Sequence, residues 1–313
     1  MIQLKISGRA GNQLFQYATV YSYMKENNID EDLYISFEEL ERKKTDTKTF
    51  FDTLSFFNVQ QYKTINKIKM TRYQKILDFC YKVNIKVVRI FRKIIKSSMK
   101  SKDYELIDKI WHKILNYNGL YYYMPTNREF YKSKNSNIVF YGSFESKEFF
   151  EKYKHDIYNM LTPIQEEMIE NKELYEIIKN TNSVCVTIRR GDFLLNKFRK
   201  QFYICTPEYF EKAINKISKM IEKPQFVVFS DDVEWCKKNM KFPEGTVFES
   251  GNDPIWEKIR LMYSCKNFII SNSTFSWWAQ YLSKNENKIV IAPKEWNRFE
   301  YTDLIYDKKW ILI

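Results

Sequence analysis

The second half of the chain alternates short hydrophobic runs with amphipathic segments of helical length. Runs such as 184–188 are typical of buried strands, whereas segments such as 207–221 repeat apolar residues at helical spacing. Strands that alternate with helices in this way predict a parallel sheet with helices on its faces. The predicted strands are 184–188, 225–230, 246–249, 267–271 and 288–292, and the predicted helices are 207–221, 232–240, 254–264 and 274–284.

The first half opens with the order strand, loop, helix. IQLKI alternates apolar and polar residues as a strand does, and SGRAGNQ follows it as a loop. Leu14, Tyr17, Ala18 and Tyr21 then recur at helical spacing. Later in this half, strands are predicted at 33–36 and 138–142, and helices begin at Ser146 and near Pro163.

These patterns predict an α/β protein with two Rossmann-like domains. The border is expected within 162–182, so that the domains are 1–162 and 163–313. A basic, helical insertion at about 60–130 is expected within the first domain.

Polar clusters follow four of the predicted strands: SGRAGNQ, RRGD, SDD and SNSTFS. Ligands of open parallel sheets bind at the carboxyl ends of the strands, so these clusters predict one shared crevice. Each cluster also has a purely structural interpretation. Serines and aspartates there can cap helices, and glycines can permit tight turns.

The RRGD cluster favours an anion ligand. The guanidinium groups of Arg189 and Arg190 match phosphate oxygens in bidentate fashion, and Gly191 would let a ligand approach the backbone. The alternative is that one arginine pairs with Asp192 or another nearby acid. No GxxxxGK[ST], GxGxxG or DxD motif is present, so arginines and helix N-termini are expected to neutralise a diphosphate without a metal ion.

The net charge of +12 is concentrated in one segment. Residues 60–115 contain 15 Lys and Arg against 4 Asp and Glu, a net +11, and the remainder is close to neutral. The pattern there predicts an amphipathic helix, interpreted as a surface helix or as a peripheral contact with an anionic membrane through 76–100. Its basic stripe holds Lys82, Lys86, Arg89, Lys93, Lys96 and Lys100, and its apolar stripe holds Cys80, Val83, Val87, Ile90, Phe91 and Ile94.

Several classes of protein are disfavoured by composition. No apolar run reaches the length of about 18 residues that a membrane span needs, and no secretory signal opens the chain. Five scattered cysteines without a CxxC pair favour reduced thiols and a cytoplasmic location, with peripheral attachment to the inner face of the membrane as an option. Only two histidines are present, which disfavours a histidine-rich metal site.

Four blocks in order, GRAGNQLFQYA, VTIRRGDF, FSDDVEWCKKN and SNSTFSWWAQYL, resemble glycosyltransferase family 11, the alpha-1,2-fucosyltransferases. YGSFES and APKEWN are similar to shorter blocks of that family. The resemblance implies a GT-B-type fold, with two parallel sheets facing a central crevice. It also implies inverting, metal-independent transfer of L-fucose from GDP-L-fucose to the 2-hydroxyl of a terminal galactose-type sugar on a glycan. The membrane interpretation of the basic helix would bring such an enzyme to a lipid-linked glycan.

The resemblance also assigns roles to individual residues. Arg189 and Arg190 would hold the diphosphate, and Asp231 or Asp232 would lie near the guanine. Gly11 and Asn12 would reach the donor from the first domain. Ser273, Thr274, Phe275 and Ser276 would lie along the nucleotide.

Two positions depart from the family pattern. Thr187 stands where the family has a histidine near the nucleotide base, and Glu145 stands where it tends to have glutamine. The general base is expected to be a carboxylate, Asp192 first and Glu145 second. Asp192 has the alternative role of orienting an arginine.

Other interpretations stay open. The high pI and many aromatic residues suggest a nucleic-acid-binding protein, although the charge lies away from the polar strand ends. A transferase that uses another nucleotide sugar, or a peptide acceptor, is a further alternative. Trp277, Trp278 and the tyrosines at 121–123 are either core residues or platforms for sugar rings.

Overall fold

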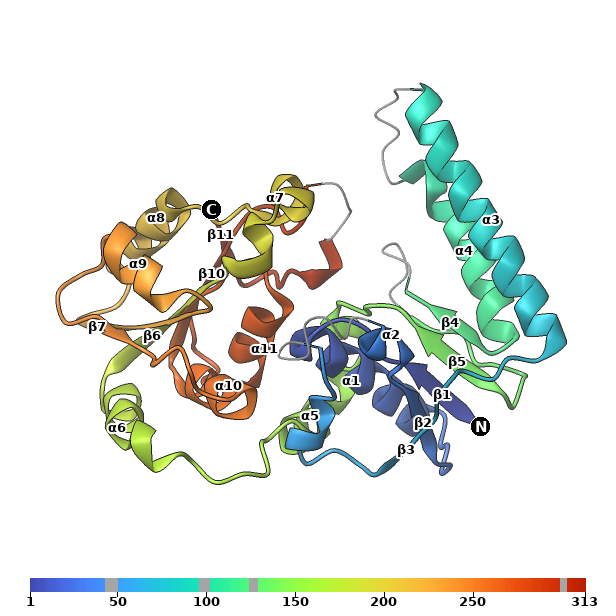
Figure 1. The fold of residues 1–313 in the computed structure, drawn as a ribbon, viewed down its shortest axis with the longest axis horizontal. Coiled ribbons are helices and arrows are strands. Elements are labelled where there is room, and N and C mark those ends of the chain that lie inside the picture. The colour runs from blue at the N-terminus through green and yellow to red at the C-terminus, as the bar shows by residue number, and fades with distance from the viewer. Residues whose placement is uncertain (43–49, 96–101, 124–128, 299–302) are drawn as a thin grey trace. The chain divides into compact units, whose positions relative to one another are not determined.

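A computed structural model describes residues 1–42, 50–95, 102–123, 129–298 and 303–313 (Figure 1). The chain forms two compact units. The N-terminal unit consists of Met1–Leu54, Val59–Ile157 and Asp303–Ile305, and the C-terminal unit consists of Ser55–Asn58, Tyr158–Thr302 and Tyr306–Ile313.

The N-terminal unit contains a parallel sheet in the order β3-β2-β1-β5-β4. Two of its strands, β3 and β4, come from the segment at 60–130, for which the sequence predicts a helical insertion only. That prediction is wrong at both ends of the segment, where a strand of three residues joins the sheet in each case. The bounds are β1 Ile2–Lys5, β2 Leu33–Ser36, β3 Tyr62–Thr64, β4 Leu120–Tyr122 and β5 Ile138–Tyr141.

The helices of the first half differ in how they are buried. α1 (Ala10–Glu26) is buried along most of its length, whereas α3 (Arg72–Ile95) and α4 (Lys102–Tyr117) run side by side as a long hairpin (Figure 1). The predicted basic helix is therefore α3. Lys96 and Lys100 of its predicted basic stripe lie outside the described residues. The remaining helices are α2 Glu38–Glu41 and α5 Lys154–Met160.

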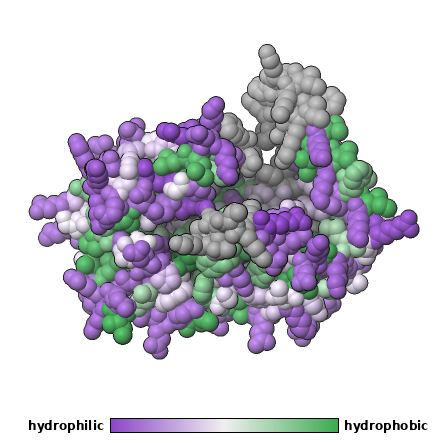
Figure 2. All heavy atoms as spheres, in the orientation of Figure 1, coloured by the Kyte–Doolittle hydropathy of each residue, from purple (hydrophilic) through white to green (hydrophobic). Residues whose placement is uncertain are grey.

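The hairpin of α3 and α4 exposes hydrophobic side chains. Figure 2 shows them beside hydrophilic ones on the outer side of α3. Among the described residues, no helix is long and apolar enough to cross a membrane. The exposed side chains are Tyr73, Ile76, Phe79, Val83 and Val87 on α3, and Leu106, Ile107, Ile110, Ile114 and Tyr117 on α4.

The C-terminal unit contains a parallel sheet in the order β11-β10-β9-β6-β7-β8. The alternation of strands and helices predicted for this half is confirmed, although the ends of the elements differ from the predicted ends by a few residues. Strand β11 and helix α7 are additional elements. The strands are β6 Asn182–Ile188, β7 Pro224–Ser230, β8 Val247–Phe248, β9 Asn267–Ile269, β10 Val290–Ala292 and β11 Ile311–Leu312, and the helices are α6 Lys172–Asn180, α7 Asn196–Phe202, α8 Pro207–Ile217, α9 Val233–Asn239, α10 Ile255–Ser264 and α11 Thr274–Leu282.

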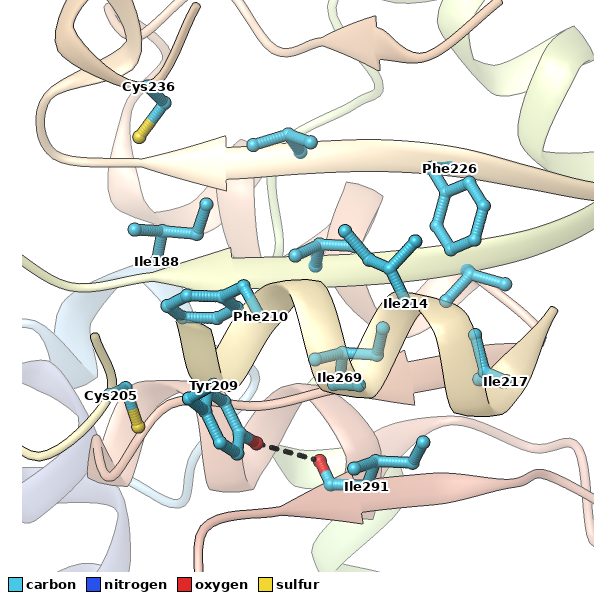
Figure 3. Close-up of a cluster of buried hydrophobic side chains, with 14 residues drawn as sticks. Ile188, Cys205, Tyr209, Phe210, Ile214, Ile217, Phe226, Cys236, Ile269 and Ile291 are labelled. Atoms are coloured by element: carbon cyan, nitrogen blue, oxygen red, sulfur yellow. Dashed lines mark hydrogen bonds between the residues drawn. The ribbon is translucent and has the colours of Figure 1, made fainter. Parts of the chain in front are cut away.

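Alternate side chains of the central strand β6 pack on α8 (Figure 3). Val184, Val186 and Ile188 belong to this cluster, and the residues between them are also buried. A strand buried on both faces reads as one apolar run, which is why the sequence pattern located it. The hydroxyl of Tyr209 donates to the carbonyl oxygens of Ile270 at 2.7 Å and of Ile291 at 3.4 Å, the latter drawn in Figure 3.

The cysteines and the tryptophan pair are structural in this fold. All five cysteines are reduced, and all but Cys80 are buried. Burial raises the pKa of the Cys205 thiol to about 12, which keeps it protonated. Trp277 and Trp278 are buried in α11, as the core interpretation of this pair predicts.

Candidate functional site

Three of the four polar clusters meet at the carboxyl edge of the C-terminal sheet. RRGD follows β6, and the strands β7 and β9, which precede SDD and SNSTFS, flank β6 on either side. Hydrogen bonds join the clusters: the Arg190 backbone N–H donates to Asp231 Oδ1 at 2.8 Å, and the Ser271 N–H donates to Thr187 Oγ1 at 3.2 Å. The register of the parallel strands thus brings these three loops together.

The guanidinium group of Arg189 lies between two carboxylates. Its Nη2 donates to Asp192 Oδ1 at 2.6 Å, and its Nη1 lies 2.5 Å from Asp231 Oδ2. The side chain is 25% exposed, so the surrounding water screens these ion pairs only in part. The structural alternative raised for the arginines, pairing with a nearby acid, is therefore present at Arg189.

Arg190 is held by a carboxylate and a ring. Its Nε donates to Asp232 Oδ2 at 3.1 Å, and its guanidinium carbon lies 3.1 Å from the ring centroid of Trp235. Only 11% of the side chain is exposed. A planar guanidinium stacks well on an indole ring, so these two contacts fix its plane.

Trp235 was missed as a site residue in the sequence analysis. It lies in the first turn of α9, three residues after Asp232. Residues three apart on a helix share a face, so Asp232 and Trp235 are spaced to reach the same partner. This spacing in FSDDVEW was the available signal, but the arginine partner lies in the loop after β6, and local sequence does not show that this loop is a neighbour.

Gly191 meets a different requirement from the one the sequence suggested. A Cβ atom at this position would lie 2.6 Å from Asp231 Oδ2. The missing side chain therefore makes room for the carboxylate that binds Arg189. Approach of a ligand to the Gly191 backbone stays a prediction.

The capping interpretation fails for two of the polar residues. Asp232 and Ser273 occupy the N-cap positions of α9 and α11, and neither side chain caps its helix. Asp232 is instead paired with Arg190. Ser273, Thr274 and Phe275 are half-buried at the start of α11.

Thr187 and Ser276 lie in the interior rather than at the rim. Both are nearly fully buried. The Thr187 hydroxyl accepts the Ser271 N–H, and the Ser276 hydroxyl is 3.1 Å from the Ser271 hydroxyl. These bonds hold the β9–α11 loop, and a direct contact of either residue with a donor stays a prediction.

The fourth cluster lies at the carboxyl edge of the N-terminal sheet. Gly11 and Asn12 are in the first turn of α1, and Asn12 Nδ2 donates to Glu145 Oε1 at 3.4 Å. β1 and β5 are neighbours, which brings the two residues together. Gly8 has a φ of +77° and a Cβ there would lie 2.9 Å from the Asn12 Cβ, so the tight-turn interpretation holds for this glycine.

The described residues contain no group of three His, Cys, Asp or Glu side chains arranged to hold a metal ion. His112, one of the two histidines, is buried against Phe130 and Tyr131. Burial lowers the pKa of His112 to about 4. This histidine is therefore neutral at physiological pH and belongs to the packing of α4.

Comparison with known proteins gives the family. An alpha-1,2-colitosyltransferase from Escherichia coli is 30% identical over 100% of this chain and 99% of that protein. Galactoside alpha-(1,2)-fucosyltransferase 1 from Homo sapiens is 33% identical over 104 residues, which are 32% of this chain and 28% of the human protein. A NodZ alpha-1,6-fucosyltransferase structure soaked with GDP-fucose has a TM-score of 0.51 at 12% identity, over 90% of this chain and 92% of that one.

The structural likeness agrees with the predicted GT-B-type fold, which the two α/β units with parallel sheets also support. The family model described as "Glycosyl transferase family 11" matches residues 1–313, which confirms the resemblance carried by the four sequence blocks. The protein is therefore a glycosyltransferase, and the chain belongs to glycosyl transferase family 11.

Proposed function

We propose that this enzyme transfers L-fucose from GDP-L-fucose to the 2-hydroxyl of a terminal galactose-type sugar, with inversion and without a metal ion. The observation that carries the proposal is the pair Arg189 and Arg190, held side by side at the carboxyl edge of the C-terminal sheet. Membership of the family supports the reaction type. A nucleic-acid-binding role has no comparable support.

The two arginines are suited to a departing diphosphate. A guanidinium has five N–H donors. The ion pairs formed with the described residues engage two N–H-bearing nitrogens of Arg189 and one of Arg190. The remaining N–H groups would bind phosphate oxygens, and one preorganised donor of this kind contributes about 3 kcal/mol to transition-state stabilisation.

The aspartates then act as positioning residues. Asp192, Asp231 and Asp232 contact the arginines directly, so we propose that they fix the two guanidinium planes before the donor binds. This role replaces the guanine contact as our assignment for Asp231 and Asp232. Ser273, Thr274 and Phe275 would border the nucleotide, because the N-terminus of α11 favours negative charge.

A donor panel tests the proposal. We expect GDP to raise the melting temperature of the protein, and UDP and CMP to leave it unchanged, because a ligand bound only by the folded state stabilises it. Arg189→Lys and Arg190→Lys should each abolish the GDP shift and transfer while the proteins stay folded, since an ammonium cannot form the fork.

Arg199→Lys is the matched control, because Arg199 is exposed on α7 and its guanidinium lies over the Tyr203 ring. It should bind GDP as the unaltered protein does. A normal GDP shift in both site variants would refute the phosphate role, and a shift with UDP instead of GDP would refute the donor.

A second donor is favoured by one relative. The Escherichia coli protein that is 30% identical over the whole chain is named an alpha-1,2-colitosyltransferase, and this name indicates colitose as the sugar that it transfers. GDP-colitose therefore belongs in the same panel as GDP-L-fucose. A higher kcat/KM for GDP-colitose would reassign the sugar and keep the nucleotide.

We also propose that the hairpin of α3 and α4 contacts an anionic membrane surface, where lipid-linked glycan acceptors would be found. Exposed hydrophobic side chains repeat along both helices, from Tyr73 to Val87 and from Leu106 to Tyr117. The surrounding segment 60–115 carries 15 basic against 4 acidic residues. Apolar side chains inserted among lipids and basic side chains near anionic headgroups support peripheral binding together.

A further inference from the structure

A row of side chains crosses the carboxyl edge of the N-terminal sheet. The strand register pairs Lys5 of β1 with Tyr141 of β5, and Tyr141 with Tyr122 of β4. Residues at one level of neighbouring parallel strands point to the same face of a sheet. Lys5, Tyr141 and Tyr122 therefore form one wall, and the Lys5 ammonium lies 4.6 Å from the centroid of the Tyr141 ring.

Helices α2 and α3 supply carboxylates that hold this row. The Tyr141 hydroxyl donates to Glu39 Oε1 at 2.9 Å, and Lys5 Nζ lies 3.0 Å from the same oxygen. The Tyr122 hydroxyl donates to Asp78 Oδ1 at 2.7 Å. Asp78 also forms an ion pair with Lys82 of α3, whose Nζ lies 2.6 Å from Asp78 Oδ2.

A cavity of about 210 Å³ opens beside this row. Burial and the hydrogen bond to Glu39 raise the pKa of Tyr141 to about 12, so its hydroxyl stays a hydrogen-bond donor at neutral pH. Apolar side chains complete part of the wall. The lining includes Lys5, Glu38, Lys67, Lys82, Tyr122 and Tyr141.

Three carboxylates at the cavity are paired with cations, and Lys67, which also lines it, takes part in none of these pairs. Glu39 is neutralised by Lys5, Asp78 by Lys82, and Glu38 by Arg42. A cationic ligand would therefore gain little, because each of these carboxylates already has a cation. A purely apolar ligand would remove charged groups from water without replacing their hydrogen bonds.

A neutral ligand with many hydroxyl groups brings no charge of its own and can still form hydrogen bonds with the charged groups at the cavity. Its hydroxyl groups can donate to carboxylate oxygens, which have about four lone-pair sites each, and can accept from lysine ammonium groups. Its C–H face can lie on the edge or face of a tyrosine ring. A pyranose sugar combines these properties.

We propose that this cavity is a binding subsite for a pyranose ring of the acceptor glycan, formed by the β1–β5–β4 row and closed by α3. The assignment of the bound sugar to the acceptor rests on the proposed function. Binding of a sugar in the cavity can be tested independently of that function. It also gives the basic helix α3 a part in acceptor recognition, through Asp78 and Lys82.

Saturation-transfer NMR on the full chain tests binding without a donor. The probes are the methyl β-glycosides of galactose, glucose and N-acetylglucosamine at millimolar concentration. We expect at least one of them to show saturation transfer with the unaltered protein. Tyr141→Ala should weaken that signal strongly, and Tyr141→Phe, which keeps the ring, should weaken it less.

Lys82→Met has a matched control in Lys75→Met. Lys75 is an exposed lysine of the same helix that does not line the cavity. With lactose as acceptor, we expect Tyr141→Ala and Lys82→Met to raise the acceptor KM about tenfold, a loss of about 1.4 kcal/mol of binding. In Tyr141→Ala and Lys82→Met, we expect no change in the KM for the donor or in the GDP-induced thermal shift. None of these values should change in Lys75→Met.

The outcomes separate this inference from the proposed function. If GDP binds and the sugar signal is the same in Tyr141→Ala as in the unaltered protein, the subsite is refuted and the donor assignment stands. If GDP does not bind but a glycoside signal depends on Tyr141, the subsite stands and the donor assignment falls. No saturation transfer from any of the three glycosides overturns the subsite.

Discussion

At the residue scale, the candidate donor site is a balance of opposite charges. Arg189 and Arg190 contribute two positive charges, and the three aspartates in contact with them contribute three negative ones. Two adjacent arginines repel each other, and the aspartates offset that repulsion in the absence of a ligand. Binding of a diphosphate would therefore depend on N–H groups that the aspartates do not engage. A guanidinium can serve an aspartate and a phosphate at once because its N–H groups point in several directions. A lysine ammonium is expected to fail in this double role.

Asp192 and Glu145 compete for the role of general base. The Asp192 carboxylate accepts from Arg189, whereas Glu145 lies at the carboxyl edge of the other sheet beside Asn12. A carboxylate that positions an arginine supports catalysis at every pH at which it is ionised. A general base also sets the acidic limb of the pH–rate profile. We expect Asp192→Asn to lower kcat and keep the acidic limb, and Glu145→Gln to remove it.

The measurement is the pH dependence of kcat/KM for both variants beside the unaltered enzyme. Loss of the acidic limb in Asp192→Asn, with the limb intact in Glu145→Gln, would reverse the assignment and return Asp192 to the base role.

At the element scale, α4 contains a buried histidine that is not one of the candidate site residues. His112 is buried, and burial lowers its pKa from 6.5 to about 4. The unfolded chain takes up a proton at this residue below about pH 6.5, while the folded chain does so only near pH 4. The free energy of unfolding should therefore fall as the pH decreases through this window, by at most about 1.4 kcal/mol per pH unit from this group.

His112→Phe should remove this contribution. We expect the difference in unfolding free energy between His112→Phe and the unaltered protein to be constant above about pH 7 and to move in favour of the variant between about pH 6.5 and 4. Urea unfolding at a series of pH values measures it. The same substitution at the exposed His155 provides a matched control variant. Parallel curves for His112→Phe would contradict the prediction.

The hairpin of α3 and α4 packs on the sheet through a face that differs from the predicted one. Its helices are long and amphipathic, but the predicted apolar stripe of α3 is not the face that meets the sheet, since Cys80, Val83 and Val87 are exposed. The structure packs Leu77, Tyr81 and Trp111 with the core beside β4 and leaves Phe79 and Val83 exposed. Both helices thus present an apolar surface that the N-terminal unit does not cover.

At the scale of the whole molecule, the charge is uneven, since 60–115 carries a net +11 of the total +12. If the hairpin binds anionic membranes, the protein should co-sediment with vesicles that contain phosphatidylglycerol, weakly with pure phosphatidylcholine vesicles, and less at high salt. The double variant Ile76→Ser, Phe79→Ser should reduce co-sedimentation, because both side chains are exposed on α3.

Ile169→Ser is the matched control, an isoleucine that is 85% exposed in the C-terminal unit. It should sediment as the unaltered protein does. Sedimentation that is insensitive to both anionic lipid and salt would remove the membrane proposal and leave the hairpin as a surface feature of its unit.

The sequence located most of the fold because strands buried on both faces and amphipathic helices have distinct periods. The run at 184–188 and the helix at 207–221 correspond to β6 and α8 for this reason. β3, β4 and β11 were missed, whereas the equally short β8, β9 and β10 were located because predicted helices separate them in a regular alternation. Their existence depends on a neighbouring strand that supplies hydrogen bonds.

By itself, the sequence determined the residue types at the strand ends, the family, and the concentration of positive charge in one segment. Only the tertiary structure decided which aspartate holds which arginine, that Trp235 stacks on Arg190, and that Lys5, Tyr141 and Tyr122 form one wall. These contacts join residues far apart in the chain, and their partners follow from strand order and register. Local sequence patterns encode periodicity within an element, but they do not encode which elements become neighbours.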